Sequence, residues 1–272
     1  MSRASKIAVL AALCPLAVLA ASAGCGEGAT MGGDAGTGDD GPRARPVPVA
    51  EKAQPRHDRG GRQGSPPGRL RVARRGHPFV VVRKGSEVDV RAEPGGEVVE
   101  TVNAHTAFGS PSVFAVFERD GRWAGVPSAF LPNGRLGWIH LDPDLMRAGS
   151  TDSSITVDLS ERSARLLEGG RTVRTFAVTV DSPGAETPTG RFAVTDTFRG
   201  GLDPVYGCCA VAITARQTKV PSDWIGGDRI AFHGTSGPLG VAASHGCVRA
   251  ADADVSALVN RVSLGTPVTI RG

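Results

Sequence analysis

The sequence predicts a mainly β protein with two consecutive β regions behind an apolar leader and a polar linker. Short runs of Val, Ile, Phe and Thr, separated by turn residues, recur from about residue 76 to the end of the chain. One segment, 252–262, has apolar residues at helical spacing. Residues 26–75 offer almost no apolar side chain to a core, so we expect them to form a disordered linker.

The first 25 residues have the composition of an export signal. Arg3 and Lys6 precede an apolar run over 7–21, which is shorter than the ~20 residues of a comfortable membrane span. The small residues before Cys25 resemble a bacterial lipobox, with Ser22 where Leu is usual. We expect lipidation at Cys25 and membrane anchorage, with ordinary cleavage and a soluble secreted product as the alternative. With either outcome we expect the protein outside the cytoplasm, in the periplasm or on the outer face of the cell membrane.

The linker over 26–75 is low in complexity, with glycines and acids first and then alternating Pro and Arg. Residues 42–75 hold ten Lys or Arg against two acids, Glu51 and Asp58. This charge favours contact with anionic wall polymer or lipid headgroups. A solvated spacer without a specific partner is the alternative. Nucleic acid is not an expected partner of an exported chain.

The first β region spans 76–148. We expect its strands at 79–82, 88–92, 113–117, 123–126 and 134–139. Several short strands at such close spacing are typical of a small barrel. The histidines at 77, 105 and 140 lack the spacing of metal ligands, so the sequence predicts no metal site here.

The segments 90–95 and 137–139 of this region resemble bacterial SH3-type domains. That resemblance implies a small SH3-like β-barrel. Such domains often bind cell-wall peptides, which is one expectation. The other is that the barrel is a spacer that positions the region behind it.

The second region spans 150–272 and begins as a β meander. Strands are expected at 155–159, 164–167 and 175–180. The one helix is expected near 252–262, with Asp252 as its N-cap. About 120 residues are enough for an independent core.

A thiol and two imidazoles are concentrated in this region. The blocks are His233-Gly234-Thr235 and Ser244-His245-Gly246-Cys247-Val248-Arg249. A thiol is an effective nucleophile as thiolate, and an imidazole can take its proton and later deliver it to a leaving amine. Gly246 allows a sharp backbone turn beside the thiol.

These two blocks resemble the signature of the L,D-transpeptidase catalytic domain of the YkuD type. The segment 187–192, Thr-Pro-Thr-Gly-Arg-Phe, resembles the second marker of that family, and 265–270 resembles its closing strand. The resemblance covers about 155–270. It implies a β-sandwich with one or two short helices and chemistry that needs no cofactor.

Cys247 is the expected nucleophile, and either His233 or His245 could be its base. His245 would have to fold back across a tight turn, whereas His233 arrives from a preceding strand. The family pattern gives the role of base to His233. An ion pair between His233 and Cys247 would lower the pKa of the thiol.

The surrounding residues have supporting roles in this hypothesis. The carbonyl of Gly234 would fix the tautomer of the imidazole, and the N–H groups of Gly246 and Cys247 would form an oxyanion hole. Arg249 would hold a substrate carboxylate or, alternatively, form a structural ion pair. Ser244 would fix the loop by hydrogen bonding, and Thr235 belongs to the expected substrate-binding set.

The adjacent Cys208 and Cys209 are expected to be free packing residues, because a disulfide between neighbours is strained. Neither a second Cys pair nor a matched His pair accompanies them, so we expect no metal site.

The resemblance implies a peptidoglycan L,D-transpeptidase that acts on tetrapeptide stems. The Cys247 thiolate would form a thioester with release of the terminal D-Ala, and an amine of another stem would resolve it. With water as acceptor the same site would be an L,D-carboxypeptidase. A third possibility is a non-catalytic SH3-type adaptor that binds the cell wall.

Overall fold

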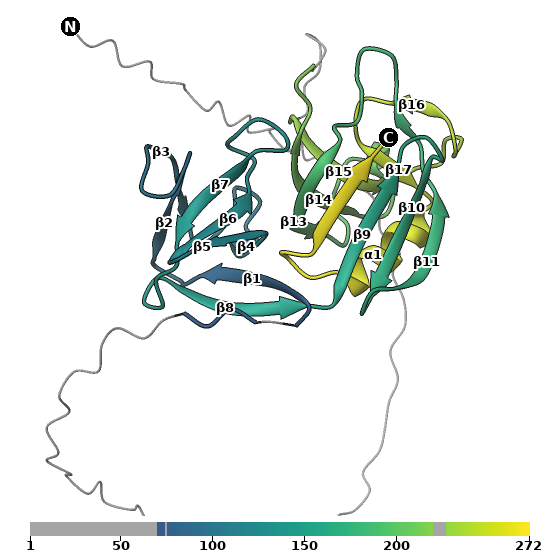
Figure 1. The fold of residues 1–272 in the computed structure, drawn as a ribbon. Coiled ribbons are helices and arrows are strands. Elements are labelled where there is room, and N and C mark those ends of the chain that lie inside the picture. Colours follow the sequence, from purple (N-terminus) through teal and green to yellow (C-terminus); the bar gives the residue numbers. More distant parts are fainter. Residues whose placement is uncertain (1–69, 74, 220–226) are drawn as a thin grey trace, which may run out of the picture. The chain divides into compact units, whose positions relative to one another are not determined.

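The computed structural model describes residues 70–73, 75–219 and 227–272, all of which fall in one compact unit (Figure 1). The predicted export signal, Cys25 and nearly all of the linker lie outside the described residues. The described part consists mostly of strands, with one α-helix and one 3₁₀ turn, so the predicted mainly β fold class is confirmed.

The first region consists of two small antiparallel sheets. Strands β4, β1 and β8 form one of them, and the other has the order β3-β2-β7-β6-β5. The strands are β1 His77–Val82, β2 Glu87–Arg91, β3 Val98–Asn103, β4 Val113–Ala115, β5 Glu118–Asp120, β6 Trp123–Pro127, β7 Leu136–His140 and β8 Met146–Thr151. Alternating residues of these strands, among them Val80, Val90, Val126 and Ile139, share one core.

Three strands of this region were absent from the sequence prediction, and each has a physical reason. β3 and β5 are mostly exposed edge strands without apolar alternation. β8 is held chiefly by its pairing with β1, in which Val80 lies opposite Ala148. Leu70 and Val72 also pack against the core, although the sequence assigned them to the linker.

The second region is built on an eight-stranded sheet with the order β11-β10-β9-β18-β13-β14-β15-β17, beside a two-stranded pair of β12 and β16. The strands are β9 Ser153–Asp158, β10 Ser163–Glu168, β11 Arg171–Ala177, β12 Val180–Asp181, β13 Gly190–Phe198, β14 Ala210–Arg216, β15 Arg229–Gly234, β16 Ala242–Ser244, β17 Val248–Ala250 and β18 Pro267–Arg271. β18 pairs with both β9 and β13, so the last strand of the chain joins the halves of the sheet.

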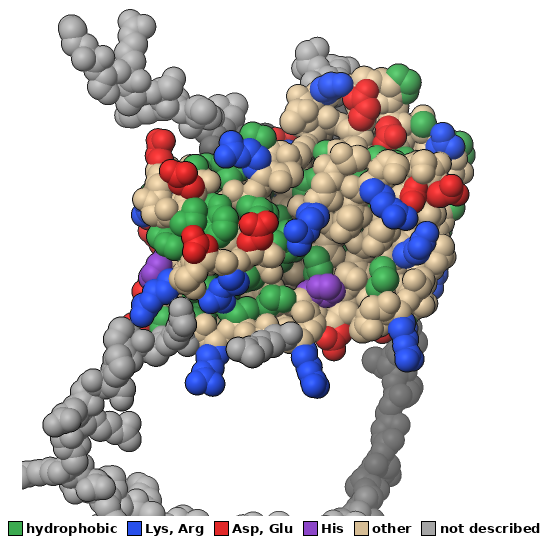
Figure 2. Space-filling model, viewed as in Figure 1, with side chains coloured by type: hydrophobic (Ala, Val, Ile, Leu, Met, Phe, Trp, Pro, Cys, Tyr) green, Lys and Arg blue, Asp and Glu red, His purple; other side chains and the backbone are tan. Residues whose placement is uncertain are grey.

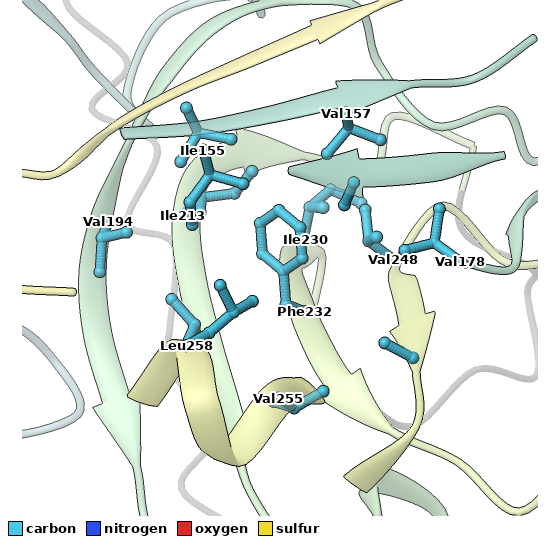
Figure 3. Packing of buried hydrophobic residues seen from close by; sticks show 14 of the residues in the cluster. Ile155, Val157, Val178, Val194, Ile213, Ile230, Phe232, Val248, Val255 and Leu258 are labelled. Carbon is cyan, nitrogen blue, oxygen red and sulfur yellow. The ribbon is translucent and has the colours of Figure 1, made fainter. Parts of the chain in front are cut away.

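Helix α1, Asp252–Arg261, packs on β14 and β15. Figure 3 shows its Val255 and Leu258 directed toward Phe232, and all three side chains are almost completely buried. Strand β14 is apolar along most of its length because it is buried on both faces. This packing fixes β15, which carries part of the candidate site.

The predicted N-cap of the helix is wrong by one residue. Ala251 is the N-cap and provides no side-chain hydrogen bond, while Asp252 is the first helical residue. Its carboxylate accepts a hydrogen bond from the backbone N–H of Cys208, at 3.2 Å between Oδ1 and N. Asp252 and Asp254 in the first turn, and Arg261 in the last, still have the favourable signs for the helix dipole.

Charges of both signs cover the molecule. Residues 76–272 contain 19 Lys or Arg and 21 Asp or Glu, so the basic excess of the sequence belongs to the segment before them. The face in Figure 2 accordingly has dispersed basic and acidic side chains rather than one basic patch. No helix among the described residues is long and apolar enough to cross a bilayer.

Candidate active site

The two sequence blocks meet at the edge of the large sheet. Strands β15 and β17 are parallel neighbours, with Phe232 opposite Val248 and His233 opposite Arg249. Cys247 comes directly before β17, beside Ala231, whose backbone hydrogen bonds to its sulfur. The edge pairing therefore brings the thiol to the strand that carries His233.

A pocket opens over this edge. It is lined by Val205, Tyr206, Gln217, Gly227, Asp228, Arg229, Ile230, His233, His245, Cys247 and Arg249. The thiol and both candidate imidazoles thus face one space, as a reaction on a bound substrate requires. The pocket lining does not include Ser244, Gly246, Gly234 or Thr235.

The imidazole of His233 is held in one tautomer. Its Nδ1 lies 2.8 Å from the carbonyl oxygen of Gly234, which can only accept a hydrogen bond. Nδ1 therefore carries the proton, and Nε2 is left as an acceptor. His233 is only 3% exposed, and its ring packs edge-on against Tyr206 at a centroid distance of 5.1 Å.

Burial acts on both members of the thiol–imidazole pair. It raises the pKa of the Cys247 thiol, opposed by the Ala231 backbone hydrogen bond and the charge of Arg249. Burial also lowers the pKa of His233, opposed by the bond to Gly234, while Arg249 lowers it further. Both directions favour a neutral thiol and a neutral imidazole at rest, so they oppose the ion pair that the sequence reasoning considered.

The turn before Cys247 corrects one predicted role. Gly246 has φ +98°, and its N–H donates to the Oγ of the fully buried Ser244 at 3.2 Å. Ser244 therefore fixes the loop, as predicted, but its contact occupies one of the two N–H groups assigned to the oxyanion hole. The Gly246 N–H is not an available donor in this structure, because it already has a partner.

Arg249 and Thr235 differ in their relation to the pocket. Arg249 lines it and forms no ion pair within the described residues, and its buried Nε lacks a hydrogen-bond partner there. The structural ion pair considered for Arg249 is therefore absent from this part of the chain. The hydroxyl of Thr235 instead accepts from the backbone of Gly237, at 3.1 Å.

Sequence reasoning named four of the eleven residues that line the pocket, and Tyr206 and Gln217 are among the seven that it missed. Tyr206 is the single tyrosine of the chain and ends a 3₁₀ turn, η1, Pro204–Tyr206. Burial raises the pKa of its hydroxyl, and the charges of Cys247 and Asp203 raise it further. Its uniqueness in the sequence was the available signal. Gln217 had no such signal, since it follows an apolar strand as an ordinary polar residue.

The prediction of free thiols at Cys208 and Cys209 is wrong, because the structure joins them in a disulfide. The expectation rested on the strain of a bridge between neighbouring residues. Cys247 is the free cysteine of the described residues. The described part of the chain has no cluster of three or more potential metal ligands.

Comparison with known proteins matches the part of the chain that contains this pocket. Residues 152–270 match the model of the L,D-transpeptidase catalytic domain, YkuD. A Bacillus licheniformis protein that bears the name L,D-transpeptidase YkuD is 28% identical over 130 residues, 47% of this chain and 71% of its own length. Its Bacillus subtilis namesake is 28% identical over 118 residues, 43% of this chain and 64% of its own length. These matches support a YkuD-type L,D-transpeptidase catalytic domain over residues 152–270.

Solved structures are more distant. An L,D-transpeptidase from Mycobacterium smegmatis has 16% identity and a TM-score of 0.36, covering 50% of this chain and 73% of its own. That similarity is too low to assign a reaction to this chain.

Proposed function

We propose that this protein is a cysteine-dependent peptidoglycan L,D-transpeptidase whose nucleophile is Cys247 and whose general base is His233. The single observation that carries the proposal is the hydrogen bond between Nδ1 of His233 and the carbonyl of Gly234, at 2.8 Å. It leaves Nε2 as an acceptor in the pocket that Cys247 also lines.

The chemistry starts from a neutral pair. Nε2 of His233 takes the thiol proton as the sulfur attacks the carbonyl carbon of the third stem residue. The C–S bond forms, the C–N bond to the terminal D-Ala breaks, and the imidazolium gives its proton to the leaving amine. An amine of a second stem then attacks the thioester, its proton passes through His233 to the departing sulfur, and a new amide remains.

Supporting roles follow from the surroundings. The N–H of Cys247 is the backbone donor for the oxyanion, since that of Gly246 is bound to Ser244. Arg249 offers its guanidinium to a substrate carboxylate, since it lines the pocket without an acid partner among the described residues. His245 is exposed on the same pocket and contacts the substrate or the leaving group.

The proposal extends to the cellular setting. We place the protein outside the cytoplasm, anchored by lipid on Cys25, with the first region as an SH3-like module near the wall. A membrane fractionation of the full-length protein and of Cys25→Ser tests the anchor. Loss of the variant from the membrane fraction is expected, and equal association of both forms would contradict lipidation.

The reaction itself is tested by mass spectrometry of tetrapeptide muropeptides incubated with the purified protein and with Cys247→Ala. The wild type should release D-Ala and form cross-linked dimers, while the variant should leave the substrate intact. Tripeptide products without dimers would identify water as the acceptor and an L,D-carboxypeptidase. Turnover by the Cys247→Ala protein would contradict the proposal.

A further inference from the structure

Gln217 makes more contacts around the turn before Cys247 than its position in the sequence indicates. The residue is 9% exposed and lines the pocket. Its Nε2 donates to the carbonyl of His245 at 3.1 Å and to that of Glu186 at 3.3 Å. Its Oε1 accepts from the backbone N–H of Lys219 at 2.9 Å. Three of the four hydrogen-bonding positions of this carboxamide are thus bound to backbone groups.

The contact with His245 acts on the peptide group directly before Gly246. The carbonyl end of that peptide is held by Gln217, and its N–H end is held by Ser244 Oγ. A peptide group is planar, so two hydrogen bonds at opposite ends fix its orientation. The next peptide group carries the N–H of Cys247, and its orientation follows from this plane together with the backbone angles of Gly246, whose φ is +98°.

The carboxamide also lies against the Cα of Gly246. A Cβ at that position would collide with Nε2 of Gln217 and would meet Cδ1 of Ile230 at 3.1 Å. The close approach leaves the turn little room to rotate, because the groups on both sides are buried. Gln217 is 28 residues from His245 in the sequence, so the contact exists only in the folded sheet.

We infer that Gln217 is a positioning residue for the nucleophile: its carboxamide holds the His245–Gly246 peptide so that Cys247 presents its sulfur and N–H to the substrate carbonyl. This inference rests on the proposed function. Gln217 acts through the turn and takes no proton. Its loss therefore impairs acylation by a carbonyl substrate more than alkylation by a small reagent, which needs no oxyanion donor.

Two substitutions separate positioning from packing. Gln217→Met keeps the length of the side chain and removes both donors. Gln217→Glu keeps the shape and can donate to a carbonyl only when protonated. Burial beside two carbonyl oxygens favours the protonated form, so the glutamate should donate at acidic pH and lose this ability as the pH rises.

The experiment follows acylation of the full-length protein by a carbapenem, measured by intact mass from about pH 5.5 to 9, with iodoacetamide alkylation of Cys247 in parallel. Rates of the two variants are compared at each pH. The ratio of the acylation rates of the two variants cancels the contribution of the titratable and charged neighbours, because these are the same in both proteins. The neighbours are Glu186, Lys219, His245, Arg216 and Asp228.

For Gln217→Met we expect acylation to fall by about 10- to 100-fold at every pH, with alkylation within about threefold of wild type. Gln217→Glu should acylate faster than Gln217→Met at acidic pH and converge with it at alkaline pH. Asn133→Asp is the matched control. It removes a carboxamide donor to the carbonyl of Arg216, at 2.6 Å, and should leave both rates unchanged.

The outcomes distinguish this inference from the proposed function. If the wild type is acylated and both Gln217 variants are acylated at the wild-type rate at every pH, the positioning role alone is overturned. A parallel fall in acylation and alkylation, with a constant ratio between the variants across pH, would show that Gln217 only stabilises the fold. If the wild type is not acylated at all, the proposed function fails, and this inference fails with it.

Discussion

The two β regions bury polar groups to very different extents. Of the polar or charged side chains buried among the described residues, two serines belong to the first region and ten belong to the second. A buried polar group costs free energy unless it is hydrogen bonded, so most such groups have a partner in the fold. In the second region His233, Ser244 and Gln217 are grouped around one thiol. The first region has an apolar core in which Ser112 and Ser128 are the buried polar residues.

The largest effect should come from removing the sulfur. Cys247→Ala should eliminate carbapenem acylation and change the free energy of unfolding by only about 1 kcal/mol, because a small side chain replaces another. Intact mass and thermal unfolding provide the two measurements. A persistent adduct on the variant would place the nucleophile elsewhere in the chain.

The next effect concerns the turn beside the thiol. Gly246→Ala places a Cβ against Gln217 at φ +98°, so the turn must shift. We expect acylation to fall by about 100-fold and stability by about 1–3 kcal/mol. The matched control is Gly240→Ala, which has φ +75° and nothing within 4 Å of the new Cβ. If Gly246→Ala and Gly240→Ala lose acylation equally, backbone strain alone explains the effect.

A substitution in the apolar core of the first region should lower the stability of the protein and leave acylation nearly unchanged. Ile139 is fully buried there, and Ile139→Ala should cost about 2–5 kcal/mol of stability. Acylation at a temperature where both proteins are folded should stay within about twofold of wild type. A proportionate loss of acylation would show that the first region takes part in the chemistry, and the contrast between the regions would fail.

Sequence reasoning found what local patterns encode. The alternation of Ala164 and Leu166, and the helical spacing of Val255 and Leu258, place these side chains in the core, where the structure has them. Both signature blocks contribute residues to one pocket, and the carbonyl of Gly234 lies at the Nδ1 of His233.

The missed features depend on contacts between distant segments. The role of Gln217 arises from a turn 28 residues away, and the edge strands β3 and β5 have no apolar pattern of their own. Asp252 was expected to cap its own helix, and it binds the backbone of Cys208 instead. The N–H of Gly246 was assigned to the oxyanion before its bond to Ser244 could be known.

A smaller effect should appear in the pH dependence of the thiol. Because burial raises the pKa of Cys247, its alkylation by iodoacetamide should be slow at neutral pH and should increase mainly above the ordinary range of a thiol, ~8.5. Because burial lowers the pKa of His233, acylation should be lost only as the pH falls below ~6.5, when the base becomes protonated. Fast alkylation that is independent of pH near neutrality would instead indicate a resting ion pair.

The most direct test of the central claim compares the two histidines of the pocket. The rate of carbapenem acylation should be measured by intact mass for wild type, His233→Ala and His245→Ala, with each protein shown to be folded by circular dichroism. Loss of a general base removes about 10²–10⁴-fold of rate, so His233→Ala should fall by that amount and His245→Ala by clearly less. If His245→Ala collapses acylation while His233→Ala retains it, His245 is the base and the assignment of that role to His233 is wrong.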